Sequence, residues 1–304
     1  SFLCVMFRAY YVGITQTKIL TVNSIVMLLS NVALNYCLIF GKGGFPAAGI
    51  AGAAIASSVS EAVSLLFFII YTSMTADKRK YGFRRAFTLR PHLLKGMLSI
   101  SGWTMVQSFI SVSIWFIFFL AIEHLGERPL AVTNIVRNIS ALLIMVISAF
   151  ATTAGALISN QIGAGEQRCL FKTCGMTLKL TYAILIPLLI ILCLFPESVL
   201  RAFTDSPSLI AASVNSVYVM ASSTLIMAPS FILFNAVSGT GNTRAGFIME
   251  MISLAVYTAV IYYGIIRLKP DVALCWFSEH VYGVTLIFLA WWYLKSGKWR
   301  GKKV

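Results

Sequence analysis

Three carboxylates lie inside long apolar stretches of this 304-residue sequence, where a charge is hard to accommodate. Glu61 lies near the middle of one stretch, Glu279 lies beside His280, and Glu250 follows Arg244 by about a turn and a half of helix. An ionisable side chain inside a membrane span is costly and is a functional candidate for that reason. Each carboxylate could exchange a proton or pair with a positively charged compound. Each could instead be a hydrogen-bonded group that fixes the packing of two helices.

Metal and enzyme chemistry are not indicated. The six cysteines are scattered and none of the three histidines neighbours a cysteine, whereas a zinc site needs closely spaced Cys and His ligands. The sequence contains neither a Gly-x-Ser-x-Gly nor a His-Glu-x-x-His motif. His280 and Glu279 need not cooperate, because consecutive residues point about 100° apart on a helix. We therefore expect no metal site, no cofactor and no catalytic residue, and a membrane-embedded enzyme is the least favoured class.

Long apolar helices must position these carboxylates, because 59% of the residues are apolar and only 11% are charged. A typical soluble protein carries about 25% charged residues. A span needs about 20 predominantly apolar residues, and the sequence predicts an all-α, polytopic membrane helix bundle. The eight predicted spans are 19–40, 48–72, 97–122, 131–158, 176–195, 209–237, 246–266 and 272–294.

The basic residues indicate the orientation of these spans. Most Lys and Arg residues fall in alternate connections, above all in the run KRKYGFRRAFTLRPHLLK at 78–95 and in the tail at 295–304. Because cytoplasmic connections are enriched in Lys and Arg, we predict a multi-pass plasma (inner) membrane protein with a cytoplasmic C-terminus. The net charge of +14 then lies beside lipid headgroups, and the expected partner is the bilayer rather than nucleic acid.

Two short motifs recur in the same order. GITQTK at 13–18 matches GTGNTR at 239–244, and SEAV at 60–63 matches SEHV at 278–281. These matches predict that the helix pair 19–72 is repeated as the pair 246–294, in the same orientation. Parallel repeats of this kind occur in secondary transporters, which place substrate between two halves.

The repeat predicts two lobes of six spans, of which this chain holds the first only in part. Residues 1–78 are interpreted as the remnant of an N-lobe, with the end of its fourth helix and its fifth and sixth helices. Residues 79–96 are the predicted cytoplasmic connection, 97–294 a complete C-lobe with helices 7 to 12, and 295–304 a basic cytoplasmic tail.

Three segments of the sequence resemble the multidrug and toxin extrusion (MATE) family of cation-coupled antiporters. They are FRAYYVGITQTK with the following LLSNVALNYCLIFGKGGFPAAGIAGAAIASS, ATTAGALISNQIGAGE at 151–166, and SGTGNTR at 238–244. The resemblance implies twelve helices in two six-helix lobes that alternate between outward and inward openings. It implies export of small organic, often cationic, compounds in exchange for H+ or Na+, by a monomer. A flippase of lipid-linked saccharides from the same superfamily is the alternative, but its cavity should be rich in basic residues, and only Arg137 lies inside a span.

The resemblance also implies candidate binding residues. Asn31 and Asn35 match a polar pair that family members place beside a cation site in the N-lobe, and Ser57 lies where the family often has Thr. The alternative for the asparagines is a hydrogen bond between helices. In the seventh helix many members carry Glu after a Gln-Ser pair, whereas here Ser111 replaces the acid after Gln107-Ser108. The family pattern therefore leaves the C-lobe site without its usual carboxylate.

Overall fold

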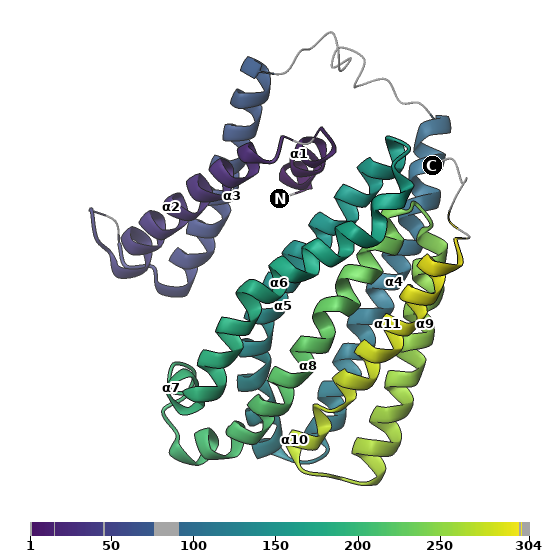
Figure 1. Cartoon of the computed structure of the whole chain (residues 1–304). Helices are drawn as coiled ribbons and strands as arrows, with labels where there is room; N and C mark the ends of the chain where they lie inside the picture. Colours follow the sequence, from purple (N-terminus) through teal and green to yellow (C-terminus); the bar gives the residue numbers. More distant parts are fainter. Residues whose placement is uncertain (1, 15, 45, 76–90, 298, 300–304) are drawn as a thin grey trace. The chain divides into compact units, whose positions relative to one another are not determined.

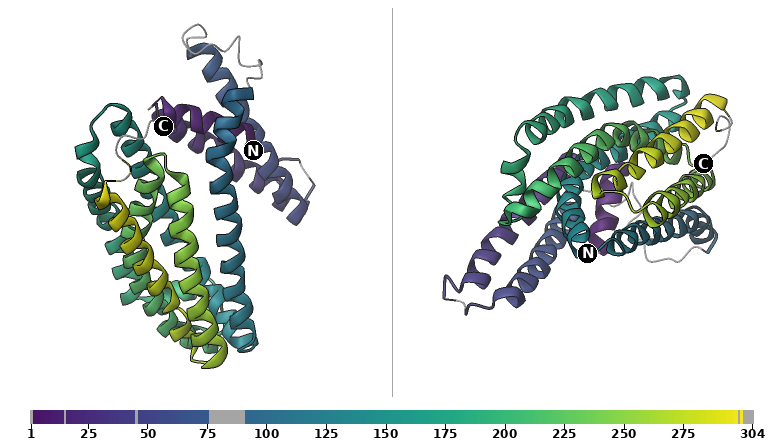
Figure 2. Two further views of the ribbon diagram at one scale, coloured as in Figure 1. Left: turned by 90° about the vertical axis from the view of Figure 1, so that its right-hand side faces the viewer. Right: turned by 90° about the horizontal axis from the view of Figure 1, so that it is seen from below.

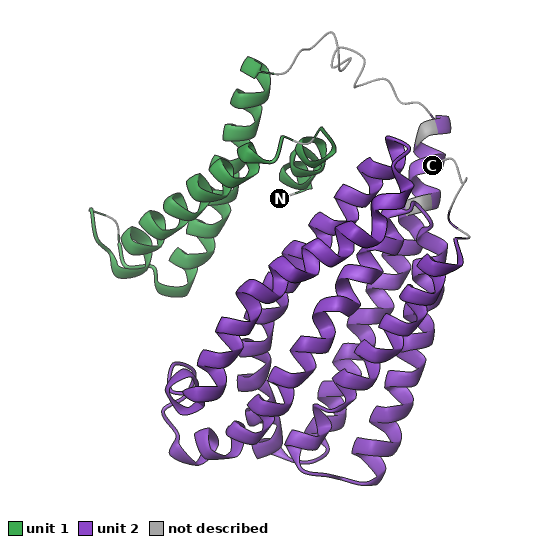
Figure 3. Cartoon of the chain, in the orientation of Figure 1, with its two compact units in different colours: residues 1–90 green, residues 91–304 purple. Residues whose placement is uncertain are grey.

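The structure is a computed structural model that describes residues 2–14, 16–44, 46–75, 91–297 and 299, and these residues form helices and no strand. The chain divides into two compact units, residues 1–90 and residues 91–304 (Figure 3). Residues 76–90, which include most of the predicted connection at 79–96, lie outside the described residues. So does most of the predicted tail at 295–304.

Unit 1 contains a short helix and a helical hairpin. The helices are α1 (Phe2–Gly13), α2 (Lys18–Phe40) and α3 (Gly49–Thr75), and α2 packs along α3 (Figure 1). Gly41 ends α2 in the left-handed region at φ 66°, which glycine adopts without steric cost. A small apolar cluster of Tyr11, Ile19 and Phe68 forms the core, and the Tyr11 hydroxyl lies 2.7 Å from Thr72 Oγ1.

Unit 2 is a bundle of long helices that lie side by side (Figures 1 and 2). Two apolar clusters fill its interior. Its α-helices are α4 (Pro91–Glu123), α5 (Glu127–Gly163), α6 (Leu170–Leu194), α7 (Pro196–Leu200), α8 (Pro207–Gly239), α9 (Thr243–Val260), α10 (Val272–Cys275) and α11 (Ser278–Ser296), and they are joined by the 3₁₀-helix η2 (Gln167–Cys169) and the π-helix η3 (Ile261–Arg267).

Eight helices of the described residues are long and apolar enough to cross a membrane, and each coincides with a predicted span. The prediction of an all-α polytopic bundle is confirmed. The helices extend beyond the apolar runs, so that α4 begins at Pro91 rather than at 97 and α5 continues to Gly163. The hydropathy did not predict two irregularities in these helices. The helix α9 continues as the π-helix η3, and a turn at 276–277 separates α10 from α11.

Two of the segments that resemble the MATE family, those at 151–166 and 238–244, meet where α5 packs against α8. A Cβ atom on Gly239 would lie 2.5 Å from the carbonyl oxygen of Gly155, and a Cβ on Gly155 would lie 2.9 Å from that of Asn235. Small residues let membrane helices approach this closely. The same SGTGNTR segment then starts α9, because Asn242 accepts a hydrogen bond from the Ala245 amide and donates one of 2.6 Å to Tyr293 on α11.

Pro229 leaves one carbonyl of α8 without its helical partner, because proline has no N–H to give to the residue four positions before it. That residue is Leu225, and its carbonyl oxygen accepts a hydrogen bond of 2.8 Å from the Tyr182 hydroxyl on α6. The interruption in α8 is therefore bridged by a neighbouring helix, and α8 is continuous from Pro207 to Gly239.

Candidate functional site

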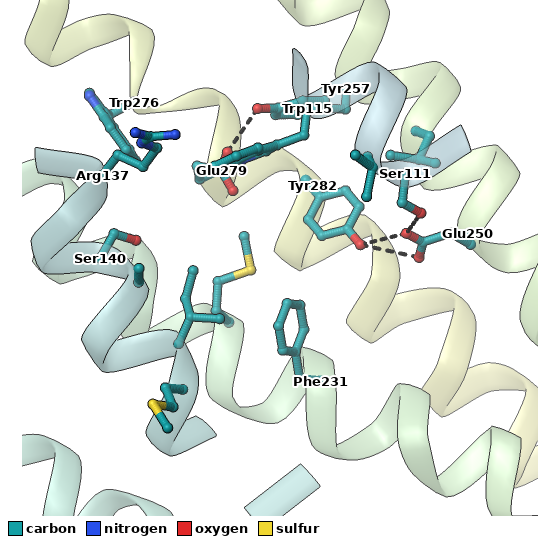
Figure 4. Close-up of a pocket in the computed structure, with 16 residues that line it drawn as sticks. Ser111, Trp115, Arg137, Ser140, Phe231, Glu250, Tyr257, Trp276, Glu279 and Tyr282 are labelled. Atoms are coloured by element: carbon teal, nitrogen blue, oxygen red, sulfur yellow. Dashed lines mark hydrogen bonds between the residues drawn. The ribbon is translucent and has the colours of Figure 1, made fainter. Parts of the chain in front are cut away.

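Unit 2 contains a partly open cavity of about 480 Å³ between α4, α5, α8, α9 and the α10–α11 segment (Figure 4). Most of its wall is apolar and is rich in aromatic and methionine side chains. Ligand sites in proteins typically combine such a wall with a few polar groups that fix orientation. Among the wall residues are Trp115, Met145, Met227, Phe231 and Trp276.

Glu250 is one of two carboxylates in this cavity, and three helices hold it. The Ser111 hydroxyl on α4 donates a hydrogen bond of 2.9 Å to Glu250 Oε1. The Tyr282 hydroxyl on α11 lies 2.9 Å from Oε1 and 3.1 Å from Oε2. Glu250, on α9, is only 4% exposed. A buried carboxylate needs such partners, because an unpaired one is strongly destabilising.

Ser111 can turn its hydroxyl hydrogen toward either of two oxygens. Its Oγ lies 2.9 Å from Glu250 Oε1 and 3.0 Å from the backbone carbonyl oxygen of Gln107. Serine has a single O–H but can also accept hydrogen bonds. An ionised Glu250 therefore receives the hydrogen of Ser111. A protonated Glu250 can instead donate to Ser111, which then donates to Gln107.

Glu279 is the second carboxylate of the cavity, and it also pairs with a tyrosine. Here the carboxylate lies on α11 and the tyrosine on α9, which reverses the arrangement at Glu250. The Tyr257 hydroxyl on α9 donates a hydrogen bond of 2.8 Å to Glu279 Oε1 on α11. Each of the two helices thus gives one carboxylate and one tyrosine to the other. The rings of Tyr257 and Tyr282 meet edge to face at 5.8 Å, an arrangement that aromatic pairs favour.

Sequence reasoning missed the two tyrosines, although a signal was present. Tyr282 lies three residues after Glu279, and Tyr257 lies seven residues after Glu250. Both spacings place the acid and the phenol on one face of a helix. Reading Tyr as an apolar residue of a span hid this pattern.

Arg137 also lines the cavity. Its guanidinium carbon lies 5.1 Å from the centroid of the Phe119 ring and 5.9 Å from that of Trp115. Stacking of this kind is a favourable cation–π contact. Its Nε is buried without a hydrogen-bond partner among the described residues, as is the Nε1 of Trp276.

His280 has partners of its own. Its Nε2 lies 2.9 Å from Ser222 Oγ, and its ring stacks on Phe277 at 4.6 Å. Glu279 instead bonds Tyr257. The two neighbours in sequence therefore belong to different contacts, as the helical geometry predicts.

The candidate residues of unit 1 are arranged differently. Asn35 Nδ2 donates a hydrogen bond of 2.9 Å to Asn31 Oδ1, and Asn35 Oδ1 is buried with no partner in the part of the chain that the structure describes. Ser57 and Glu61 lie on α3 with exposed side chains. The structure thus joins the two asparagines in unit 1, and it joins Ser111, Glu250 and Glu279 in one cavity of unit 2. Gln107 is not among the residues that line this cavity, and its backbone carbonyl accepts a hydrogen bond from Ser111.

The fold and the cavity define a polytopic helical membrane protein with a carboxylate site inside its bundle. The family model for MatE matches residues 104–263, which is more than half of the chain. The chain therefore belongs to the MATE family, whose members are transporters rather than enzymes.

Curated relatives extend the similarity over most of the chain. An uncharacterized transporter, YisQ, of Bacillus subtilis is 25% identical over 264 residues, which are 83% of this chain and 55% of the relative. A probable multidrug resistance protein NorM of Thermotoga maritima is 25% identical over 291 residues, which are 90% of this chain and 59% of the relative. The chain thus spans about half the length of the curated relatives it matches.

Solved structures share the fold. A MOP superfamily transporter from Pyrococcus furiosus superposes with a TM-score of 0.78 at 17% sequence identity, over 90% of this chain and 62% of that one. The MATE transporter VcmN of Vibrio cholerae gives a TM-score of 0.81 at 12% identity, over 97% of this chain and 65% of that one. The arrangement of helices is therefore that of this transporter fold.

Proposed function

We propose that this chain is part of a secondary active antiporter that exports small organic cations in exchange for H+, with Glu250 as the proton-binding group. The observation that carries the proposal is the Glu250 carboxylate, 4% exposed, in an aromatic cavity and bonded by Ser111 and Tyr282. Relatives named as multidrug resistance proteins support the substrate class.

Exchange of an organic cation for H+ follows because the Glu250 carboxylate can bind either of them but not both at once. An ionised Glu250 attracts an organic cation. A protonated Glu250 is neutral, no longer attracts the cation, and directs its hydrogen to Ser111, which turns its own hydrogen to the carbonyl of Gln107. Glu250, Ser111 and Tyr282 keep hydrogen-bond partners in both states, which matters because an unpartnered buried polar group is costly.

The partners of Glu250 favour H+ over Na+ as the coupling ion. Ser111 and Tyr282 are both positioned as hydrogen-bond donors to the carboxylate. A hard cation such as Na+ needs several oxygen atoms with lone pairs directed at it, as the oxygen-rich sites of other hard cations show. Among the described residues, only two hydroxyl oxygens lie within hydrogen-bond distance of the Glu250 carboxylate, fewer than such a site needs.

The wall of the cavity suits aromatic or aliphatic cations. Trp115, Phe231 and Tyr257 present ring faces and edges, and Met145 and Met227 add flexible, polarisable surface. Aromatic faces attract cations, and methionine-rich surfaces adapt to different ligands. We propose small organic cations as the substrates for this reason.

The remaining parts of the proposal concern the whole transporter. Alternating access, a monomeric state, placement in the inner membrane and a cytoplasmic C-terminus are proposed from the family resemblance and from the alternation of Lys and Arg. Asn31 and Asn35, with Ser57, are proposed as a second cation site in unit 1, where the unpaired Asn35 Oδ1 is an available oxygen.

The test is ethidium binding to the purified protein in lipid nanodiscs at low buffer concentration. We expect ethidium to bind more tightly as the pH rises, because protons compete for Glu250, and each bound cation should release about one proton. Exchanging NaCl for KCl at the same ionic strength should leave the affinity for ethidium unchanged. Glu250→Gln should abolish proton release and weaken binding at least about tenfold, since an ionic partner is lost inside the bundle.

Glu197→Gln is the matched control, because Glu197 is an exposed carboxylate on α7 outside the cavity. It should leave both readouts unchanged. Proton release that persists in Glu250→Gln, or displacement of ethidium by Na+, would contradict the proposal.

A further inference from the structure

A second hollow of unit 2, of about 380 Å³, is a groove between α5 and α6, which pack side by side (Figure 1). None of the residues that line this α5–α6 groove lines the cavity that contains Glu250. One end of the groove is polar, with Gln161 of α5 and Lys172 of α6. The rest of its surface is mainly apolar and includes Phe150, Leu157, Met176 and Leu180.

A hydrogen bond between the two helices orients the polar end of the groove. Thr173 Oγ1 on α6 donates over 2.9 Å to Gln161 Oε1 on α5. Because the carbonyl oxygen of Gln161 is bound in this way, its amide nitrogen can donate to a ligand. The hydroxyls of Thr153 and Thr177 donate to backbone carbonyls of their own helices, over 2.8 Å and 2.9 Å. The donors that the groove offers to an anion are therefore the Gln161 amide and the lysine at its end.

Two lysines lie on the same face of α6. Lys172 and Lys179 are seven residues apart, which is about two turns of helix, and both side chains are exposed. The Cα–Cβ bond of Lys179 tilts toward the N-terminal end of α6, where Lys172 lies, and a long side chain can extend along a membrane helix toward the headgroups. Between residues 151 and 196 the sequence has three basic residues and a single acid, Glu166, which is exposed before η2. Positive charge therefore exceeds negative charge at this end of the groove.

The polarity along the groove changes as it does through one leaflet of a bilayer. From Lys172 to Leu180, α6 rises by about 12 Å, and half of a hydrocarbon core is about 15 Å thick. Met176 and Leu180 are 58% and 54% exposed, so the surface beyond the lysine is apolar and accessible. A ligand that fits has an anionic head and a long apolar tail.

We infer that the α5–α6 groove binds an anionic phospholipid. Its phosphate lies at Lys172, Lys179 and the Gln161 amide, and one acyl chain lies along Met176 and Leu180. Basic pockets between membrane helices bind anionic headgroups in this way, and the cytoplasmic leaflet, on which we predict the connection between α5 and α6, is rich in anionic lipids. A zwitterionic lipid with the same chains binds less well, because its own cationic group is repelled by the lysines.

The test is native mass spectrometry of the purified protein with an equimolar mixture of palmitoyl-oleoyl phosphatidylglycerol and palmitoyl-oleoyl phosphatidylcholine. These two lipids carry the same acyl chains, so the comparison isolates the headgroup. We expect the first bound lipid to be phosphatidylglycerol at least about tenfold more often, because each lysine near an anionic lipid favours binding by about fivefold. The double variant Lys172→Gln, Lys179→Gln should lower this preference below about twofold.

Two further variants separate the groove from the rest of the surface. Lys95→Gln is the matched control, because Lys95 is an exposed lysine on α4, which does not line the groove. It should keep the wild-type preference. Met176→Trp obstructs the groove without changing its charge, and Met176 is exposed enough for the larger side chain to leave the core in place. It should weaken binding of the first phosphatidylglycerol by about threefold or more, since the acyl chain loses apolar contact.

Three results would overturn the inference. Wild-type protein that takes up both lipids equally has no anionic lipid site. A loss of preference in Lys95→Gln as large as that in the double variant would assign the effect to the charge of the whole surface. Displacement of phosphatidylglycerol by added inorganic phosphate would mean that the lysines bind free phosphate and not a lipid.

This inference does not rest on the proposed function, because the groove and the Glu250 cavity share no lining residue. The double lysine variant should bind ethidium as the wild-type protein does. If the lipid preference is absent while ethidium binding persists, only the lipid site is wrong. If ethidium does not bind while the lipid preference is present, only the proposed function is wrong.

Discussion

The two helix pairs related by the sequence repeat, α2–α3 in unit 1 and α9–α11 in unit 2, are each joined by a buried polar contact of different chemistry. In unit 1, Asn23 Nδ2 donates to Ser64 Oγ over 2.8 Å, and both side chains are fully buried. In unit 2, Tyr282 donates to Glu250 over 2.9 Å. The motif matches that define the repeat align Tyr282 with Ser64 and place Glu250 one position after the counterpart of Asn23.

The difference shows that corresponding parts of a repeated helix pair can carry either a neutral polar contact or a carboxylate, and the proposed function assigns exchange to the carboxylate. An amide and a hydroxyl keep the same protons at every physiological pH, so the Asn23–Ser64 bond only fixes α2 against α3. A carboxylate changes charge when it binds a proton, and Glu250 has partners that suit both forms. Under the proposed function, proton exchange therefore belongs to unit 2, where Glu279 and Tyr257 add a second pair.

The sharpest test of this comparison uses the two glutamates of the repeated Ser-Glu motif. Glu279→Gln should weaken ethidium binding about tenfold, because it removes a carboxylate from the cavity wall. Glu61→Gln should leave binding unchanged, because Glu61 is exposed on α3 and does not line this cavity. Titration of each variant with ethidium measures both effects. Equal losses would mean that the two glutamates act alike and that the comparison is wrong.

A smaller effect is expected from deleting the bridging hydroxyl or amide in each unit. Tyr282→Phe should weaken ethidium binding by about threefold, since the ionised Glu250 loses one donor but keeps Ser111. Asn23→Ala should lower thermal stability by about 1 kcal/mol, because Ser64 loses its partner, and should leave ethidium binding as it was. Melting curves and ethidium titrations on the same samples separate the two results. A binding defect in Asn23→Ala would place exchange chemistry in unit 1 as well.

The smallest effect concerns the asparagine pair. Asn35→Ala removes the donor to Asn31 and the unpaired Oδ1. Loss of one hydrogen bond between polar groups in a membrane costs about 0.6 kcal/mol, so stability should hardly change. If the pair is a cation site, the variant should weaken any stabilisation by added Na+ or by ethidium in thermal unfolding. An unchanged response would assign the asparagines to packing.

The local sequence predicted the helices because hydropathy and length are local properties. All eight predicted spans are long helices in the structure. Hydropathy did not reveal the π-helical turn at Ile261–Arg267 or the break at 276–277, because a buried apolar residue looks the same in each kind of helical turn. The resemblance implies an acid where this sequence has Ser111, and the consequence of that replacement was not predictable from position alone. The structure places Glu250 of α9 in hydrogen-bond contact with Ser111 of α4.

The sequence by itself determined the class of protein, the spans and the family. It also identified Glu250, Glu279 and Arg137 as ionisable residues that are costly to place in a membrane, because an ionisable group in an apolar run is recognisable from the sequence alone. Only the tertiary structure decided which of these residues share a cavity and what each one contacts. The crossed bonds of Glu250 with Tyr282 and of Glu279 with Tyr257 join helices whose relative rotation depends on packing across the whole bundle. That rotation is set by many packing contacts at once, such as the close backbone approach of Gly155 and Gly239, and no local pattern of residues specifies it.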